Sequence, residues 1–206
     1  MGEQIMVKNP ELVMHGITEK TPKNILLGAG TIFKNLTWDT GKNQFKFDKV
    51  LGATSGGSKF SIKNEFKDIE ADGAVVKVKG LTLKYGQVAH LETNLLDISV
   101  DNLKIAMLGE EKASEMTGYK EIVPRAQLEA GDYIDNLAYV GRKADGSPVI
   151  IIMENALCTE GLELEGKNKN NSVLKVKFEC YGDITSDLQT LPVKILIPED
   201  EQKEGQ

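Results

Sequence analysis

The chain has 206 residues, of which 40% are hydrophobic and 27% charged, and its formal net charge is −6 at pH 7. This balance is typical of a globular protein with enough apolar side chains for a core, and it excludes a disordered or collagen-like chain. The negative charge argues against tight binding of nucleic acid, because affinity for phosphate comes from Lys and Arg.

The organisation expected from length is a single domain over residues 1–197, preceded by no targeting or membrane segment. The first residues lack a basic region followed by an apolar one, and no stretch is apolar enough to span a membrane. We therefore expect a protein made and kept in a cytoplasm. In that setting Cys158 and Cys180 are expected to be small buried side chains rather than a disulfide.

Segment 38–58 is rich in glycine and contains few bulky apolar side chains. A long excursion of this kind within a compact domain is usually functional, so we expect a long loop here. Trp38 is a candidate interface anchor, although a lone tryptophan also commonly fills the core of its own domain. Residues 40–84 hold 9 Lys against 5 Asp and Glu, and this basic segment on an acidic protein would suit copies that meet head to tail.

Alternation of apolar and polar residues predicts strands over 60–67, 76–85 and 88–100. The apolar phase changes at Gly80 in the second strand and after Leu95 in the third. A change of phase indicates a β-bulge or a strand that crosses between packing layers. The sequence therefore predicts a strongly curved sheet that includes two long strands.

One helix is predicted over 101–110, with a cap at Ser99 or Asp101 and a stop near Gly109. Its apolar face carries Leu103, Ala106 and Met107. Because the helix is short, we expect it to pack across an open face of the sheet.

The second half of the chain predicts two hairpins and a final strand. The first hairpin, over 133–158, turns at residues 144–148, where Asp-Gly favours a positive φ. The second, over 161–181, ends in the most regular alternation of the chain. A last strand over 193–197 precedes an acidic tail, 198–206, which is too polar to fold.

No motif for catalysis, cofactor binding or metal binding emerges. Residues 52–59 approach a phosphate-binding loop, but Ser58 precedes Lys59 and a strand follows in place of a helix. The soft metal ligands are His15, His90, Cys158 and Cys180, and no two are closer than 22 positions. We expect a protein that is not an enzyme, although a catalytic triad assembled from distant positions stays open.

A specific pattern extends over residues 51–99. It runs from Leu51-Gly52-Ala53-Thr54-Ser55-Gly56-Gly57-Ser58-Lys59-Phe60 through Glu70-Ala71-Asp72-Gly73 and Val78-Lys79-Gly80-Leu81 to Leu91-Glu92-Thr93-Asn94-Leu95-Leu96-Asp97-Ile98. These segments resemble the tail tube (major tail) proteins of long-tailed bacteriophages and prophages. The motifs cover about a quarter of the chain, and they are assembly motifs without an invariant catalytic residue.

The resemblance implies a mainly β protomer, with a β-sandwich or barrel-like fold and one flanking helix, that forms hexameric rings stacked into a hollow tube. Its N-terminal arm, 1–21, and its long loop would reach other subunits. The implied inter-subunit loop residues are Trp38, Phe45, Phe47, Gly52, Gly56, Gly57 and Lys59. The implied inner-barrel strand residues are Val76, Val78, Gly80, Leu81, Leu83, Leu91, Glu92, Leu95 and Ile98.

The partners that the resemblance implies are further copies of the chain and other tail proteins, namely the tape measure, the terminator and the baseplate or tip. DNA would pass without tight binding, because a negative lumen repels it. The implied location is the virion tail, after assembly in the host cytoplasm. The alternatives are a related tube or ring protein, such as a secretion-system tube, a tail terminator or a baseplate hub, and a small cytoplasmic β-barrel that binds a ligand.

Overall fold

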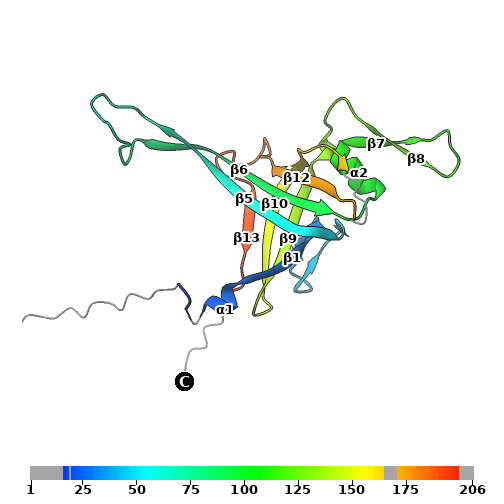
Figure 1. The fold of residues 1–206 in the computed structure, drawn as a ribbon, viewed down its shortest axis with the longest axis horizontal. Coiled ribbons are helices and arrows are strands. Elements are labelled where there is room, and N and C mark those ends of the chain that lie inside the picture. Colours follow the sequence, from blue (N-terminus) through cyan, green and yellow to red (C-terminus); the bar gives the residue numbers. More distant parts are fainter. Residues whose placement is uncertain (1–15, 19, 165–170, 200–206) are drawn as a thin grey trace, which may run out of the picture.

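The computed structural model describes residues 16–18, 20–164 and 171–199, and these form a mainly β protein (Figure 1). The helices are α1 (Thr21–Asn24), α2 (Val100–Met107) and the 3-10 helix η1 (Ala130–Asp132). The strands are β1 (Leu26–Lys34), β2 (Thr37–Asp39), β3 (Gln44–Lys46), β4 (Lys49–Val50), β5 (Thr54–Asp68), β6 (Thr82–Leu95), β7 (Gly109–Ala113), β8 (Lys120–Pro124), β9 (Ile134–Lys143), β10 (Pro148–Cys158), β11 (Glu163–Leu164), β12 (Leu174–Cys180) and β13 (Val193–Leu196). The mainly β fold class predicted from the sequence is confirmed.

Nine of these strands form one antiparallel sheet in the order β4-β1-β9-β10-β12-β6-β5, with β11 beside β12 and β13 beside β10. Two small hairpins, β2–β3 and β7–β8, stand apart from it. The sheet curls so that the chain entering β5 returns to β1, where the Leu51 amide donates to the Ile32 carbonyl at 2.9 Å (Figure 1). The result is a barrel-like body that encloses the inner face of the sheet.

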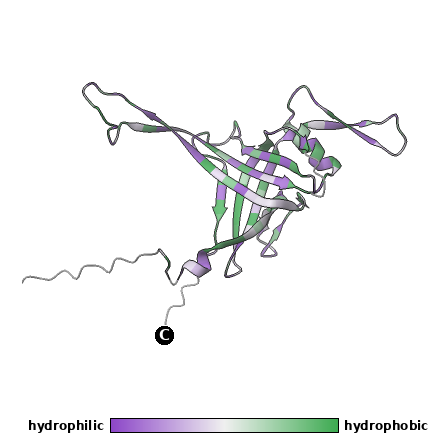
Figure 2. Cartoon of the chain, viewed as in Figure 1, coloured by the Kyte–Doolittle hydropathy of each residue, from purple (hydrophilic) through white to green (hydrophobic). Residues whose placement is uncertain are grey.

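The core lies on this inner face, where side chains from both ends of the sheet meet. Its largest members are Phe178, Ile32, Leu91, Leu95, Leu137, Met153, Leu174 and Val176. Figure 2 shows the corresponding alternation of hydrophobic and hydrophilic residues along the strands of the body. Burying each such side chain stabilises the fold by about 1.5–3 kcal/mol, so the curled face is the main source of stability.

Strand β10 lies at the centre of the sheet and changes partner along its length. One edge pairs with β9, while the other pairs with β13 at Ile150–Met153 and with β12 at Ala156–Cys158. Between the two partners, Asn155 has φ +48 and donates its side-chain amide to the Tyr181 carbonyl at 3.2 Å. The left-handed conformation of this residue interrupts the ladder, so that β10 pairs with β13 before it and with β12 after it.

The sequence predicted two separate strands, over 76–85 and 88–100, and this prediction is wrong. A single strand, β6, takes their place and pairs with β5. Val76, Val78, Gly80 and Leu81 precede β6, in the connection 69–81 at the tip of the hairpin. The Ile69 amide donates to the Leu81 carbonyl at 2.8 Å and closes this connection. The alternation of valines resembles a strand, but no facing strand meets it, because the ladder ends at Asp68 and Thr82.

The inner-barrel residues predicted from the resemblance therefore fall in three places. Leu83, Leu91, Glu92 and Leu95 belong to β6, the four residues 76, 78, 80 and 81 belong to the hairpin tip, and Ile98 follows β6 before α2. The ladder does contain irregularities, between Thr54 and Ser58 and between Glu65 and Phe66. The predicted curvature is thus present, at positions other than Gly80.

The prediction of a long loop over 38–58 is also wrong, because most of this segment has regular secondary structure. Trp38 pairs with Phe45 in the β2–β3 hairpin, β4 follows, and β5 begins at Thr54. The Asp39 carboxylate accepts hydrogen bonds from the amides of Gly41 at 3.0 Å and Lys42 at 3.3 Å, which forms a tight turn. Gly52, Gly56 and Gly57 all have positive φ, so these glycines permit the bulge at the start of β5.

The predicted helix is confirmed with shifted bounds. Ser99 caps α2 by accepting a hydrogen bond from the Asn102 amide at 3.2 Å, and the helix ends at Met107 with Leu108 at φ +49. Gly109 is not the stop but the first residue of β7. The hairpins over 133–158 and 161–181 and the strand over 193–197 are confirmed as β9–β10, β11–β12 and β13. Residues 1–15 and 19 of the arm, 165–170 between β11 and β12, and 200–206 of the tail lie outside the described part.

Candidate assembly surface

The β5–β6 hairpin extends beyond the body, as Figure 1 shows in cyan and green. The part of β6 from His90 to Leu95 pairs with β12, whereas Thr82 to Ala89 lie beside β5 alone among the described strands. The opposite edge of β5 ends the sheet. The protruding half therefore presents backbone donors and acceptors along both sides, and such edges are templates for strand addition.

Large hydrophobic side chains are exposed along this hairpin. They include Ile62, Phe66, Ile69, Val75, Val76, Val78, Leu83 and Tyr85. At the tip, Val75 is 98% exposed and Val76 is 77% exposed. Exposed apolar side chains gathered on one element are typical of interaction surfaces.

The base of the tip is held in shape by Asp68. Its carboxylate lies 2.6 Å from the Lys77 ammonium and accepts a hydrogen bond from the Thr82 hydroxyl at 2.6 Å. The bond from Lys77 is the main reason that the pKa of Asp68 lies below its ordinary value. The connection is thus tied to both strands that it joins.

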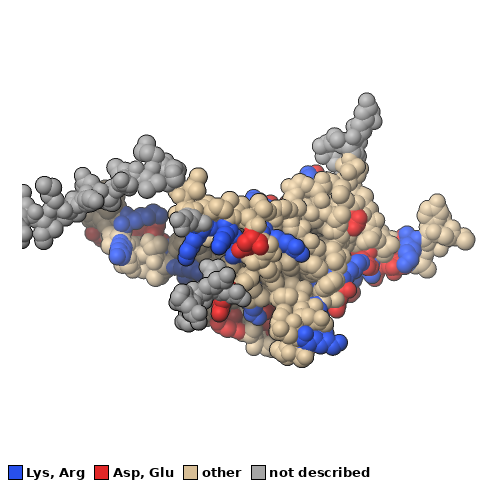
Figure 3. Space-filling model, turned by 90° about the horizontal axis from the view of Figure 1, so that it is seen from below, with Lys and Arg blue, Asp and Glu red and all other residues tan. Residues whose placement is uncertain are grey.

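The outer face of the hairpin base is charged and internally paired. Glu92 of β6 lies 3.6 Å from Lys59 of β5 and 4.0 Å from Lys177 of β12. Beside them, His90 lies 3.6 Å from Glu179. Figure 3 likewise shows basic and acidic side chains interspersed among uncharged ones on the face that it displays. The structure therefore brings together Lys59 and Glu92, which the sequence assigned to different elements.

A second apolar surface lies at the β2–β3 hairpin. The rings of Trp38 and Phe45 meet edge to face with centroids 4.6 Å apart, and Phe47 meets Phe33 at 4.8 Å. A groove of about 330 Å³ is lined by Trp38, Phe45, Pro148, Ile150, Leu196, Ile197 and Pro198. Trp38 is 48% exposed, so it is not a core residue. The contribution from residues 196–198 was missed, because nothing local in the sequence relates them to Trp38.

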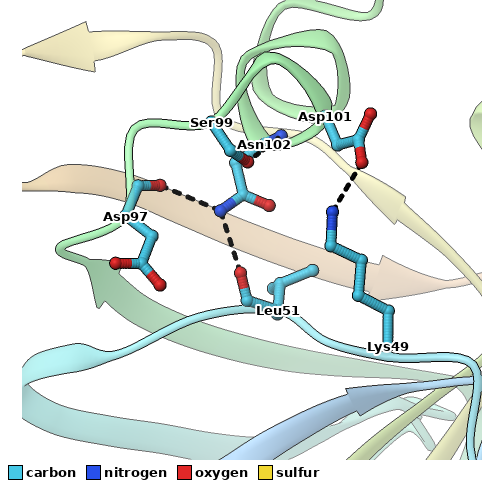
Figure 4. Close-up of polar contacts among 6 residues, drawn as sticks. All are labelled: Lys49, Leu51, Asp97, Ser99, Asp101 and Asn102. Atoms are coloured by element: carbon cyan, nitrogen blue, oxygen red, sulfur yellow. Dashed lines mark hydrogen bonds and ion pairs between the residues drawn. The ribbon is translucent and has the colours of Figure 1, made fainter.

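The remaining predicted loop residues lie at the entrance to β5. Gly52 has φ +138, and a Cβ there would lie 2.6 Å from the Asp97 carboxylate oxygen, which accepts a hydrogen bond from the Ala53 amide at 3.1 Å. Asn102 donates to the carbonyls of Leu51 and Asp97 (Figure 4). This buried amide fixes the root of the hairpin against α2, and sequence analysis did not single it out.

The candidate metal ligands and the two cysteines lie apart from one another in the described structure. Within residues 16–18, 20–164 and 171–199, no cluster of three His, Cys, Asp or Glu side chains could hold a metal ion. Cys158 and Cys180 are free and buried, as expected, and burial raises the pKa of Cys158 to about 11. In the described part of the chain, no helix is both long and apolar enough to cross a membrane.

Comparison with known proteins gives similarity in structure only. No protein-family model matches the sequence, and no curated protein matches it. The fold is similar to a chain in the tail of an empty GTA particle with C6 symmetry, at TM-score 0.40 and 12% identity, covering 83% of this chain and 96% of that one. It is also similar to a chain in the virion of a native gene transfer agent particle, at TM-score 0.40 and 12% identity, covering 76% and 95%.

Proposed function

We propose that this chain is a structural subunit of a phage or prophage tail tube, which assembles into hexameric rings stacked around a channel for DNA. The observation that carries the proposal is the β5–β6 hairpin, whose protruding edges pair with no further strand in the described part of the chain and whose apolar side chains are exposed. A two-stranded ribbon of this length is marginal in water by itself. Strand pairing between neighbouring copies would cover it.

The inner barrel of the proposed ring would consist of β5–β6 hairpins, in place of the two strands expected from the sequence. The hexameric state and the passage of DNA come from the resemblance of residues 51–99 to tail tube proteins. The net charge of −6 supports passage without tight binding, because an acidic wall gains nothing from counterion release. The other tail proteins, and the location in the virion tail, belong to the same proposal.

The test is negative-stain electron microscopy with sedimentation velocity on the full chain over a wide concentration range. Rings with a central hole, or tubes with a regular repeat, are expected. Single rings that do not stack would favour the related reading as a tail terminator. A chain that stays monomeric at about millimolar concentration would contradict the proposal.

Paired variants connect assembly to the hairpin. Replacing both Val75 and Val76 with Asp should abolish rings, because charge at the tip cannot be buried without a partner. Ile184→Asp is the matched control, since Ile184 is 90% exposed but lies outside the hairpin. If the tip variant assembles as well as the control does, the tip of the hairpin does not lie in the interface.

A further inference from the structure

A pocket of about 340 Å³ lies beside α2, and basic side chains dominate its charge. The charged residues that line it are Lys34, Lys49, Asp101, Lys104, Arg125 and Asp132. Four bases against two acids give the pocket a net charge of +2, whereas the whole chain carries −6. The pocket is therefore more favourable for a negatively charged group than the surface of the chain as a whole.

Part of this positive charge is already paired. The Lys49 ammonium lies 2.5 Å from the Asp101 carboxylate, and the Arg125 guanidinium is paired with Asp132 and, at 3.2 Å, with Glu129. Lys34 and Lys104 have no ion pair among the described residues, although both act on Asp101 together with Lys49 and help to lower its pKa. Two lysines thus remain to receive an anion.

Two buried polar atoms in the pocket walls also lack partners among the described residues. They are the side-chain oxygen of Asn102, a residue only 2% exposed, and Nε of Arg125. Because the Asn102 amide nitrogen donates to Leu51 and Asp97, its oxygen turns to the other side, toward the Lys49–Asp101 pair (Figure 4). An unpaired buried acceptor or donor costs about 1–3 kcal/mol.

An acidic peptide carries both the hydrogen-bond donors and the negatively charged acceptors that these side chains lack as partners. Its backbone N–H would donate to Asn102, and its carboxylates would accept from Arg125 and the two free lysines. The chain itself contains such a segment in Glu199-Asp200-Glu201-Gln202-Lys203-Glu204, with four acidic residues against one basic. We propose that the pocket beside α2 binds residues 199–204 of a second copy of this chain.

The direction of β13 explains why the segment would come from a second copy. Strand β13 runs from Val193, opposite Met153, to Leu196, opposite Ile150, and so leads toward the turn of the β9–β10 hairpin. The pocket residue Ile134 lies at the other end of that hairpin, opposite Ala156. The six residue-to-residue steps from 150 to 156 span about 20 Å, and the chain leaves β13 in the opposite direction.

Copies placed end to end would bring the acidic segment of one directly to the pocket of the next. This contact rests on the proposed stacking for its biological role, but its chemistry can be measured without rings. A dye-labelled peptide with the sequence of residues 197–206 is titrated into the full chain at low salt, and binding is followed by fluorescence anisotropy. The uncharged peptide, with each Glu replaced by Gln and each Asp by Asn, is the peptide control.

Lys34→Glu and Lys104→Glu should each weaken binding of the acidic peptide by about tenfold, which corresponds to one charge contact. Lys63→Glu on the exposed part of β5 is the matched control and should bind as the unchanged chain does. A peptide with Lys at positions 199, 201 and 204 should bind the Lys34→Glu, Lys104→Glu double variant, and this rescue excludes misfolding as the cause. Equal binding by all variants, or by the uncharged peptide, would overturn the proposal.

Cross-linking tests whether residues 199–204 in the pocket come from the same copy or from a second copy. Labelled (¹⁵N) and unlabelled chains are mixed, treated with a carbodiimide and digested. Links that join Lys34 or Lys104 to residues 199–204 of the other isotope support a second copy, and links of a single isotope only would overturn it. Rings that fail to form while the peptide still binds would count against the tube and not against this contact.

Discussion

The side-chain amide of Asn102 donates a hydrogen bond to the backbone carbonyl of Leu51, 2.8 Å away and 51 positions earlier in the chain. The same nitrogen donates to the Asp97 carbonyl at 2.9 Å. The two bonds join the start of α2 to both ends of the hairpin, because Leu51 precedes β5 and Asp97 follows β6. The root of the protruding hairpin therefore depends on one buried amide.

Asn102→Ala should lower the free energy of unfolding by about 2–3 kcal/mol, because it removes two hydrogen bonds and leaves carbonyls unpaired. Urea denaturation measures the change. Asn64→Ala is the control, since Asn64 accepts from Gln87 at 2.6 Å on the exposed hairpin, and it should cost under about 0.5 kcal/mol. Equal losses in the two variants would show that the Asn102 contacts carry no special weight.

Two glycines of β1 allow the cost of a strained backbone to be measured separately from the cost of a steric clash. Gly28 has φ +78 and its Cβ position is open, whereas Gly30 has φ +72 and a Cβ there would lie 2.3 Å from the Tyr139 ring. Gly28→Ala should therefore cost about 1 kcal/mol, for the left-handed backbone alone. Gly30→Ala should cost about 2 kcal/mol more, because the ring is buried in the core.

Thermal unfolding of the two variants tests this difference. A Gly30→Ala protein as stable as Gly28→Ala would mean that Tyr139 moves aside freely. Tyr139→Ala in the Gly30→Ala background should relieve the clash, although it also loses buried area.

Burial raises the pKa of Cys158 from its ordinary value of 9.0 to about 11. Above pH 9 the unfolded chain loses the thiol proton while the folded chain retains it, so the stability due to this group is complete below pH 9 and is lost as pH rises toward 11. The expected loss over that window is about 2–3 kcal/mol. Urea unfolding at pH 8 and about pH 10 should show about half of this loss, roughly 1.4 kcal/mol, and Cys158→Ala should flatten the dependence.

The single tryptophan, Trp38, reports on the apolar groove at the β2–β3 hairpin. If assembly covers this groove, as expected for the proposed tube, the emission of Trp38 should shift to shorter wavelength and acrylamide should quench it less. The Val75→Asp, Val76→Asp variant, which should stay monomeric, supplies the reference at equal concentration. Unchanged quenching in assembled rings would place the groove outside the interface.

The elements that sequence analysis identified correctly are those whose signal is local. Strand β12 alternates apolar and polar residues, and its pattern of burial follows that alternation. Ser99 begins α2 because a short hydroxyl side chain satisfies an exposed amide at that point. Asp145-Gly146 turns the β9–β10 hairpin, where Gly146 has φ +87.

The errors occurred where the structure of a segment depends on pairing with residues far away in the sequence. Val76 and Val78 alternate as a strand does, yet they lie in a connection, because Asp68 and Thr82 are the last residues that face each other in the ladder. Trp38 lies in a glycine-rich stretch, yet pairing with Phe45 makes that stretch a hairpin. Alternation determines which face a residue occupies but not which strand lies beside it.

The candidate site follows the same division. Composition, net charge and the segments over 51–99 were sufficient to suggest an acidic, mainly β assembly protein, because they are properties of the chain itself. Only the tertiary structure showed that the hairpin edges have no partner strand among the described residues, that Leu196 and Trp38 share a groove, and that four basic side chains meet beside Asn102. These features depend on residues far apart in sequence, and the curl of the sheet brings them together.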